Sequence, residues 1–359
     1  MKILYILSSY NIYGGTPKKT LDLMRCFGDR SSLYVYGNGG AEFKDLFCET
    51  GANIVDGNHG NSVYAHFRSL IRLVDDNEIE IIHTQFSMGE TLAFLVKLCR
   101  PRVKVVNAFV GPFSAGYFKR KLLSLIYRRV DAFVYVSNYV KNEKQAQFPI
   151  LRSKRGEIIY NGTEIRTSSN CVAPSPEKIV LFDVAGLVDW KNIRVLIEAL
   201  NILVNVENIT RLHLNVAGDG PERGVLEQLA DRYNLSEHVS LLGYQTNIGD
   251  LLDVTDIYLH PAYAEGFGIA VAEAMMVGKP LIVSNAGALS ELIENGVSGL
   301  VVDPHDHKAW AEAIKSLIEN PSQAALFAQN AEERAKKLFS VKTFVENYEN
   351  LYLSLIAGR

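Results

Sequence analysis

Cysteine is scarce and unpaired in this chain of 359 residues. No CxxC pair occurs, and no histidine cluster has the spacing of metal ligands. The four cysteines are far apart in sequence: Cys26, Cys48, Cys99 and Cys171. This pattern indicates four buried or idle thiols in a reducing cytosol, and it argues against a structural zinc site.

Long apolar runs are also missing. The first run, residues 3–7, is shorter than the core of a signal peptide, and no segment approaches the roughly 20 apolar residues of a membrane-spanning helix. We therefore expect a cytoplasmic protein that begins with a β-strand. With 48% hydrophobic and 21% charged residues, the composition is that of an ordinary globular protein long enough for two domains.

An excess of one charge is absent overall, since the net charge is only −3. The distribution is nevertheless uneven. Residues 1–165 contain 22 Lys+Arg and 15 Asp+Glu, a balance of +7, whereas the remainder contains 15 and 25, a balance of −10. A basic half and an acidic half predict two domains with different partners. Nothing in this pattern indicates nucleic-acid binding.

Short β-branched runs alternate with helical patterns from the start of the chain. This rhythm predicts a parallel sheet covered by helices. It pauses between about 163 and 177, in a linker-like stretch, and then restarts. The fold class is therefore α/β, with two doubly wound Rossmann-like domains, one over 1–165 and one from 172. The expected strands are 2–7, 33–36, 79–83, 103–108, 132–136, 179–184, 212–216, 239–241, 257–259, 280–283 and 300–302.

The most informative string is residues 260–274, HPAYAEGFGIAVAEA. A strand is expected to end near His260, and a helix to start near Phe267. The free backbone amides at such a helix start, together with its partial positive charge, hold a phosphate. Glu265 before the helix and Glu273 inside it are carboxylates that can each accept two hydrogen bonds from vicinal hydroxyls.

This string resembles the E-x7-E motif of the retaining glycosyltransferases of family 4, which have the GT-B fold. Further segments match that family in order and spacing along nearly the whole chain. They are Gly14-Gly15, 136–141, Asn161-Gly162, Gly186 with Lys191, the Gly-Asp-Gly-Pro turn at 218–221, 299–302 and the last helix.

The resemblance implies two domains facing across a cleft, the first being 1–165 with 341–359 and the second 172–340. The terminal helix would cross back to the first, acceptor-binding domain, and the second would bind the nucleotide sugar. It implies Glu265 and Lys191 as catalytic residues and no metal or other cofactor. The donor-binding residues would be Gly14, Gly15, Gly186, Gly266, Phe267, Gly268, Ile269, Ala270 and Glu273.

Two positions depart from the family pattern. The family has Arg after the glycine that we match to Gly186, where this chain has Leu187, so Lys191 would be the remaining cation of that segment. An arginine at 187 is then expected to tighten UDP binding, unless another basic residue, Lys18 or Lys19 near the glycine loop, already fills that space. The family also often has His where this chain has Phe109, beside the transferred sugar.

On the acceptor side we expect His83, Phe109 and Ser137, although a packed structural histidine is an equal reading of His83. Segment 112–129 mixes aromatics and leucines with five basic residues, a composition typical of helices that lie on anionic membranes. A core-packed helix with a solvated basic face explains it equally well.

The expected activity is retaining transfer of a hexose or N-acetylhexosamine from a nucleotide-diphosphate sugar, UDP favoured over GDP. The acceptor would be a glycan or lipid-linked glycan, in bacterial surface polysaccharide or lipopolysaccharide assembly, with the enzyme peripheral on the inner face of the membrane. A GT-B sugar-nucleotide epimerase and a catalytically impaired binding paralogue remain open. A nicotinamide dehydrogenase is disfavoured, because Arg223 breaks the GxGxxG pattern.

Overall fold

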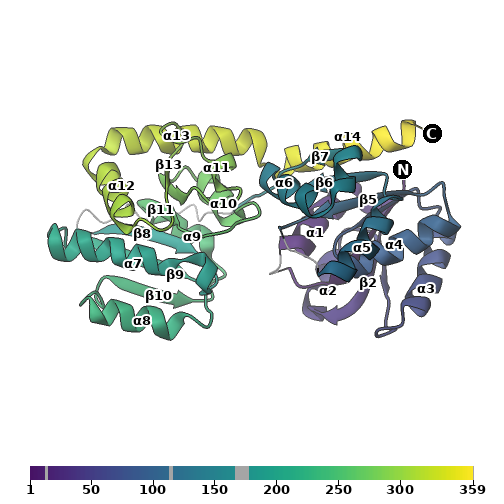
Figure 1. The fold of residues 1–359 in the computed structure, drawn as a ribbon, viewed down its shortest axis with the longest axis horizontal. Coiled ribbons are helices and arrows are strands. Elements are labelled where there is room, and N and C mark those ends of the chain that lie inside the picture. The colour runs from purple at the N-terminus through teal and green to yellow at the C-terminus, as the bar shows by residue number, and fades with distance from the viewer. Residues whose placement is uncertain (13–14, 113–115, 166–177, 359) are drawn as a thin grey trace. The chain divides into compact units, whose positions relative to one another are not determined.

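The computed structural model describes residues 1–12, 15–112, 116–165 and 178–358. Contacts divide the chain into two units. The first, the N-terminal unit, is Met1–Gly162 with Val341–Arg359, and the second, the C-terminal unit, is Thr163–Ser340. The last helix therefore belongs to the first unit (Figure 1), although it follows the second in sequence.

The N-terminal unit contains a parallel seven-stranded sheet in the order β3-β2-β1-β4-β5-β6-β7. The strands are β1 (Ile3–Ser9), β2 (Ser31–Gly39), β3 (Asn53–Asp56), β4 (Ile81–Thr84), β5 (Lys104–Phe109), β6 (Ala132–Tyr135) and β7 (Gly156–Ile158). The helices are α1 (Gly15–Phe27), α2 (Lys44–Cys48), α3 (Val63–Asp76), α4 (Ser87–Cys99), α5 (Tyr117–Tyr127), α6 (Asn138–Gln147) and α14 (Val341–Ala357).

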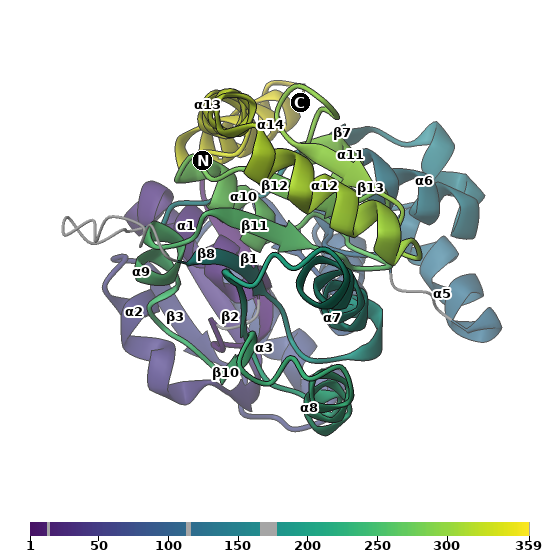
Figure 2. The ribbon, with the colours of Figure 1, turned by 90° about the vertical axis from the view of Figure 1, so that its left-hand side faces the viewer.

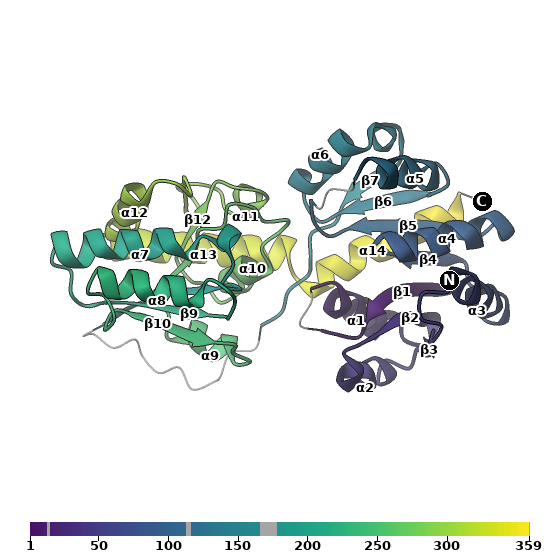
Figure 3. The same cartoon turned by 60° about the horizontal axis from the view of Figure 1, so that its bottom comes forward.

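Alternating side chains of β1 show how this sheet is covered. Ile3, Tyr5 and Leu7 join buried residues of α1 and α14 in one core, whereas Leu4 and Ile6, equally buried, point to the other face. Helices α3, α4 and α5 are successive neighbours (Figure 3). A strand buried on both faces is typical of a doubly wound parallel sheet.

The C-terminal unit contains a parallel six-stranded sheet in the order β10-β9-β8-β11-β12-β13. Its strands are β8 (Ile179–Val184), β9 (Leu212–Ala217), β10 (Val239–Gly243), β11 (Ile257–His260), β12 (Leu281–Ser284) and β13 (Leu300–Val302). Its helices are α7 (Ile193–Asn201), α8 (Arg223–Arg232), α9 (Ile248–Asp253), α10 (Ile269–Met276), α11 (Leu289–Leu292), α12 (His307–Glu319) and α13 (Pro321–Leu338).

Helix α7 lies beside both α8 and α12 (Figure 2), and α10 packs on α13. The core around Leu181, Leu214 and Trp310 includes buried residues of α7, α8 and α12. In both units strand order reverses beside the first strand of the unit, so the two neighbouring loops diverge there. Ligands of open α/β sheets bind at this point, beyond the carboxyl ends of the strands.

The predicted fold class, two Rossmann-like α/β units, is confirmed by these sheets. Two strands were missed. Both β3 and β7 are short edge strands with partly exposed residues, so neither has a clear apolar pattern. The predicted linker lies largely outside the described residues. The cysteines that the structure describes, Cys26, Cys48 and Cys99, are unpaired and exposed, so burial was the wrong alternative for these three. Cys171 falls in the undescribed stretch.

Candidate functional site

The carboxyl edge of the C-terminal sheet brings four ionisable side chains together. Lys191, at the end of the short 3₁₀ turn Asp189–Lys191, places Nζ 2.5 Å from Oε2 of Glu265. His260, the last residue of β11, contacts the same oxygen through Nε2 at 3.3 Å. Its Nδ1 lies 2.9 Å from Oδ1 of Asp183 on β8. We call these four residues the charged quartet.

Burial makes the quartet strongly coupled. Asp183 and His260 are buried, while Lys191 and Glu265 have side chains 19% and 20% exposed. Burial raises the pKa of Glu265, but the hydrogen bond from His260 and the charge of Lys191 outweigh it and bring that pKa to about 2. Burial lowers the pKa of His260, yet Asp183 and Glu265 raise it above its usual value. His260 therefore lies between two acidic side chains that favour its protonated form.

Sequence reasoning found Glu265 and Lys191 in this quartet but missed Asp183 and His260 as functional candidates. His260 could have been found from its position at the end of a predicted strand, where the string 260–274 begins. Asp183 lies on a separate strand, within the apolar run 179–184, so only the pairing of β8 with β11 brings it near His260. Its buried Oδ2 has no hydrogen-bond partner among the described residues.

The predicted phosphate cradle lies at the start of α10. Gly268 has φ +100° and precedes Ile269, the first residue of the helix, so the helix begins two residues later than predicted. Ile269 and Ala270 thus carry amides without helical partners. Phe267 is buried and packs edge-on against Phe339, with 5.4 Å between the ring centres. Its contribution to a phosphate cradle would therefore come from its backbone.

Glu273 follows within α10, one turn after Ile269 and on the same side of the helix. Its Oε1 accepts a hydrogen bond from Thr163 Oγ1 at 3.4 Å. The loop from Gly266 to Gly268 connects Glu265 to this helix. The two carboxylates of the E-x7-E string therefore flank the same helix start, as the sequence predicts.

Gly287 fixes the position of Glu265 and was not singled out by the sequence. It has φ +60°, and a Cβ on it would lie 2.3 Å from the carbonyl oxygen of Glu265 and 2.6 Å from its nitrogen. Ala288 donates a backbone hydrogen bond to the same carbonyl at 2.9 Å. The 285–288 turn therefore holds the Glu265 loop by direct backbone contact.

Gly287→Ala is expected to destabilise the protein by at least about 1 kcal/mol more than Gly296→Ala, and to weaken donor binding. Gly296 is the matched control, because it has φ +74° with nothing near its would-be Cβ. Both variants carry the same backbone strain, so the difference isolates the collision with Glu265. Urea unfolding and calorimetry with UDP-glucose measure the two effects, and equal losses for the pair would refute this role.

The structure corrects the interpretation of Leu187. Its side chain is fully buried in the core of the C-terminal unit. Its backbone N–H donates to Asp219 O, and its carbonyl oxygen accepts from Glu222 N. These two hydrogen bonds hold it against the Gly-Asp-Gly-Pro turn. A side chain there points away from solvent, whereas Gly186 is exposed and a Cβ on it meets only Asp219 O, at 3.8 Å. Position 186 therefore faces the open edge.

The expectation that an arginine at 187 tightens UDP binding is therefore withdrawn. Leu187→Arg is expected to cost about 3 kcal/mol or more of stability, because it buries an unpaired charge. Gly186→Arg is expected to keep the wild-type unfolding midpoint and to bind UDP more tightly, since it adds a cation at the exposed position. Thermal unfolding and UDP titration of the two variants decide between them.

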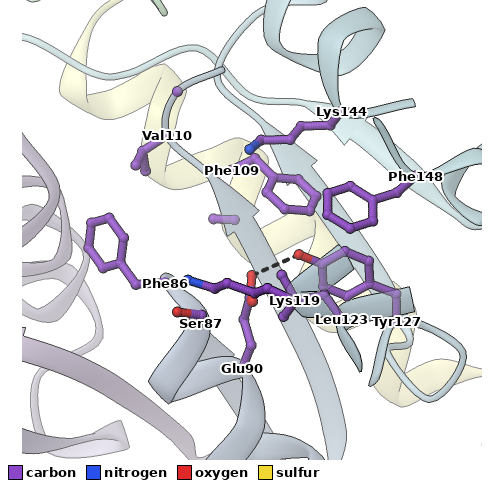
Figure 4. Close-up of a pocket in the computed structure, with 12 residues that line it drawn as sticks. Phe86, Ser87, Glu90, Phe109, Val110, Lys119, Leu123, Tyr127, Lys144 and Phe148 are labelled. Atoms are coloured by element: carbon purple, nitrogen blue, oxygen red, sulfur yellow. Dashed lines mark hydrogen bonds between the residues drawn. The ribbon is translucent and has the colours of Figure 1, made fainter. Parts of the chain in front are cut away.

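The N-terminal unit contains a cavity of about 360 Å³ at the carboxyl end of β5 (Figure 4). Phe109 ends β5 and lies stacked on Phe133 and Tyr135, with Lys144 Nζ 5.3 Å from its ring centre. It therefore forms a wall of this cavity. The lining residues are Phe86, Ser87, Glu90, Ala108, Phe109, Val110, Gly111, Lys119, Leu123, Tyr127, Lys144 and Phe148.

The other two acceptor-side candidates lie elsewhere in the N-terminal unit. His83 is buried on β4, its Nδ1 lies 2.6 Å from Tyr352 Oη, and burial lowers its pKa to about 3, so it matches the packed-histidine alternative. Ser137 is buried and caps α6 by accepting from Val140 N at 3.1 Å. Gly15 begins α1, and Gly14 lies outside the described residues.

Two features are absent from the described part of the chain. There, no helix is both long and apolar enough to cross a bilayer. Within the same residues, no three His, Cys, Asp or Glu side chains gather as a metal-binding group.

Comparison with protein-family models decides the class. Residues 20–166 match the model "Glycosyltransferase Family 4", and residues 166–334 match "Glycosyl transferases group 1". The chain is a GT-B glycosyltransferase. The first match falls on the unit with the cavity, and the second on the unit with the charged quartet.

Curated relatives of this glycosyltransferase include the N-acetyl-alpha-D-glucosaminyl L-malate synthase of Bacillus anthracis, 22% identical over 77% of this chain and 75% of the relative. The lipopolysaccharide core biosynthesis glycosyltransferase LpsD of Rhizobium meliloti is 31% identical, and the match covers 43% of this chain and 45% of the LpsD chain. The crystal structure of Anabaena Alr3699/HepE in complex with UDP has TM-score 0.84 and 22% identity, covering 99% of this chain and 100% of that one.

Proposed function

We propose that this glycosyltransferase is a retaining, metal-independent enzyme that transfers a hexose or N-acetylhexosamine from a UDP-sugar to a glycan or lipid-linked glycan. Assembly of bacterial surface polysaccharide or lipopolysaccharide is the process that suits it. The observation that carries this proposal is the charged quartet at the start of α10, where Glu265 is ionised and paired with Lys191. Among relatives, LpsD acts in lipopolysaccharide core synthesis and HepE binds UDP.

The quartet and the start of α10 suit a donor with a diphosphate. The amides of Ile269 and Ala270, the partial positive charge of the helix start and Lys191 supply positive potential without a metal. Glu265 would accept hydrogen bonds from the sugar, and Glu273 from the ribose. The backbones of Gly14, Gly15, Gly266, Phe267 and Gly268 would let the donor approach closely, and the exposed Gly186 would lie beside its diphosphate.

The proposed chemistry is front-face substitution. The acceptor oxygen bonds to the anomeric carbon while the bond from that carbon to the diphosphate oxygen breaks on the same face. The leaving phosphate takes the acceptor proton, so UDP and the glycoside are the products. A pKa of about 2 keeps Glu265 ionised at neutral pH, where it stabilises positive charge developing on the sugar.

The role of Glu273 can be tested against that of Glu265. We expect Glu273→Ala to weaken UDP binding about tenfold, because a carboxylate that accepts two ribose hydrogen bonds is lost. Glu265→Ala is the matched control on the same loop and helix, and we expect it to bind UDP normally but turn over slowly. Normal UDP affinity of Glu273→Ala in calorimetry would exclude its assignment to the ribose.

Membrane association is the remaining part of the proposal. Helix α5 buries Leu123, Ile126 and Tyr127 but exposes Phe118, which is 84% exposed, with Leu122 and Leu125. Segment 112–129 also has five exposed basic residues: Lys119, Arg120, Lys121, Arg128 and Arg129. Such a helix binds anionic bilayers through apolar insertion and charge. Flotation with anionic and neutral vesicles tests this, and equal recovery would exclude the electrostatic contribution.

A further inference from the structure

The cavity of the N-terminal unit contains a carboxylate with one unused oxygen. Glu90, in the first turn of α4, is 6% exposed. Its Oε1 accepts from Asn107 Nδ2 at 2.9 Å and from Tyr127 Oη at 3.2 Å. Its Oε2 has no hydrogen-bond partner among the described residues, although the side chain lines the cavity. A buried carboxylate held from one side only is available to a ligand donor on the other.

Two lysines give this cavity a net positive charge. Lys119 of α5 and Lys144 of α6 both line it, together with the single carboxylate of Glu90. Figure 4 shows Lys119 reaching across the space toward Phe86, and Lys144 lying over Phe109. Lys144 is 6% exposed; burial lowers its pKa, and the nearby charge of Glu90 opposes that shift. Two ammonium groups against one carboxylate favour an anionic ligand.

The walls of the cavity are apolar. Phe86, Phe109, Leu123 and Phe148 form them. Phe86 has φ +69°, a backbone conformation that is strained for a bulky residue and is found most often at functional sites. Phe86 directly precedes α4, and the free amides at a helix start favour an anion there.

Helix α5 joins this cavity to an exposed apolar row. Lys119, Leu123 and Tyr127, spaced four residues apart, line the cavity, whereas Phe118, Leu122 and Leu125 are exposed on another side of the helix. A ligand with its anion in the cavity could therefore leave an apolar chain along the same helix, where a bilayer would cover the exposed row.

We propose that this cavity binds the acceptor, and that the acceptor is a phospholipid-type molecule: a phosphate held by Lys119 and Lys144, a sugar hydroxyl donated to Glu90 Oε2, and an apolar chain beside α5. The inference rests on the proposed transferase function and specifies its substrate class. The anion and the apolar chain are required together, because neither the lysines nor the phenylalanines alone account for the cavity.

Titration with farnesyl phosphate, monitored by calorimetry below its micelle concentration, tests the proposal. Farnesol lacks the phosphate, and glucose 1-phosphate lacks the apolar chain. We expect farnesyl phosphate to bind at least about tenfold more tightly than either. Equal binding of farnesol would overturn the role of the phosphate, and equal binding of glucose 1-phosphate would show that a free sugar phosphate, not a lipid, is the ligand.

Lysine variants locate the binding site. Lys119→Met and Lys144→Met are each expected to weaken farnesyl phosphate about tenfold while leaving UDP-glucose affinity unchanged. Lys104→Met is the matched control, since Lys104 begins β5, at the end of the strand opposite the cavity. Wild-type probe affinity in both cavity variants would overturn the proposal.

UDP-glucose titration of the same samples separates this inference from the proposed function. If the wild-type protein bound neither UDP-glucose nor any other UDP-sugar, the proposed function would fail whatever the probe did. Donor binding with no affinity for farnesyl phosphate would overturn the acceptor assignment alone.

Discussion

Replacing Lys191 by alanine is expected to lower kcat/KM for sugar transfer about a hundredfold, equivalent to about 3 kcal/mol of transition-state stabilisation. Lys191 Nζ lies 2.5 Å from Glu265 Oε2 at the start of α10, where a leaving diphosphate would gain negative charge. Gly186, which occupies the exposed position of the same segment, carries no side chain that could compensate. Steady-state kinetics on the folded variant measures the loss.

Two further variants serve as controls for that result. Lys191→Arg is expected to recover only part of the rate, because a planar guanidinium does not replace a compact ammonium beside a carboxylate. Lys308→Ala removes an exposed lysine from the first turn of α12 and should leave turnover unchanged. Wild-type turnover in Lys191→Ala would show that this lysine does not neutralise the leaving group.

Replacing His260 by glutamine is expected to destabilise the protein by about 3–5 kcal/mol at pH 6, because it leaves Asp183 as a buried carboxylate without its cation. The pKa of His260 is raised above its usual value in the folded state. Its stabilising effect is therefore complete below the unfolded pKa of about 6.5 and is lost as the pH rises through the folded pKa. Urea unfolding at pH 6 and pH 9 measures this difference.

The double variant Asp183→Asn/His260→Gln supplies the control for that experiment. It removes the buried carboxylate together with its partner, so we expect it to be more stable than His260→Gln alone. The non-additivity should shrink at pH 9. Equal destabilisation by His260→Gln at both pH values would mean that His260 is neutral in the folded protein, and the quartet would then lack its central charge.

The strands could be predicted from the sequence only where they have a clear apolar pattern. Strands 179–184 and 300–302 were predicted with the bounds that the structure shows, because each is a short, mainly apolar run between turn residues. Strand β3, Asn53–Asp56, was missed because its residues are partly or fully exposed at the edge of the sheet. The polar residues Asn53 and Asp56 at its ends leave only two apolar residues, whereas the edge strand β13 is apolar throughout.

The candidate site was predictable only where its residues are contiguous. Glu265, Gly268 and Glu273 lie within one strand–loop–helix string, so their proximity follows from local structure. Asp183 contacts His260 because distant strands pair, and Gly287 contacts the backbone of Glu265 directly. Composition and periodicity encode neither contact. Leu187 shows the converse error, because matching a motif by position did not reveal which residue faces the core.

The central claim is retaining transfer from a UDP-sugar at the E-x7-E site. Proton NMR of the sugar released from α-linked UDP-glucose, UDP-galactose or UDP-N-acetylglucosamine tests it most directly, because water then serves as the acceptor. The first product observed, before mutarotation, should be the α-anomer, and Lys191→Ala should suppress its release about a hundredfold. A β-anomer as first product, or release unaffected by Lys191→Ala, would contradict the account.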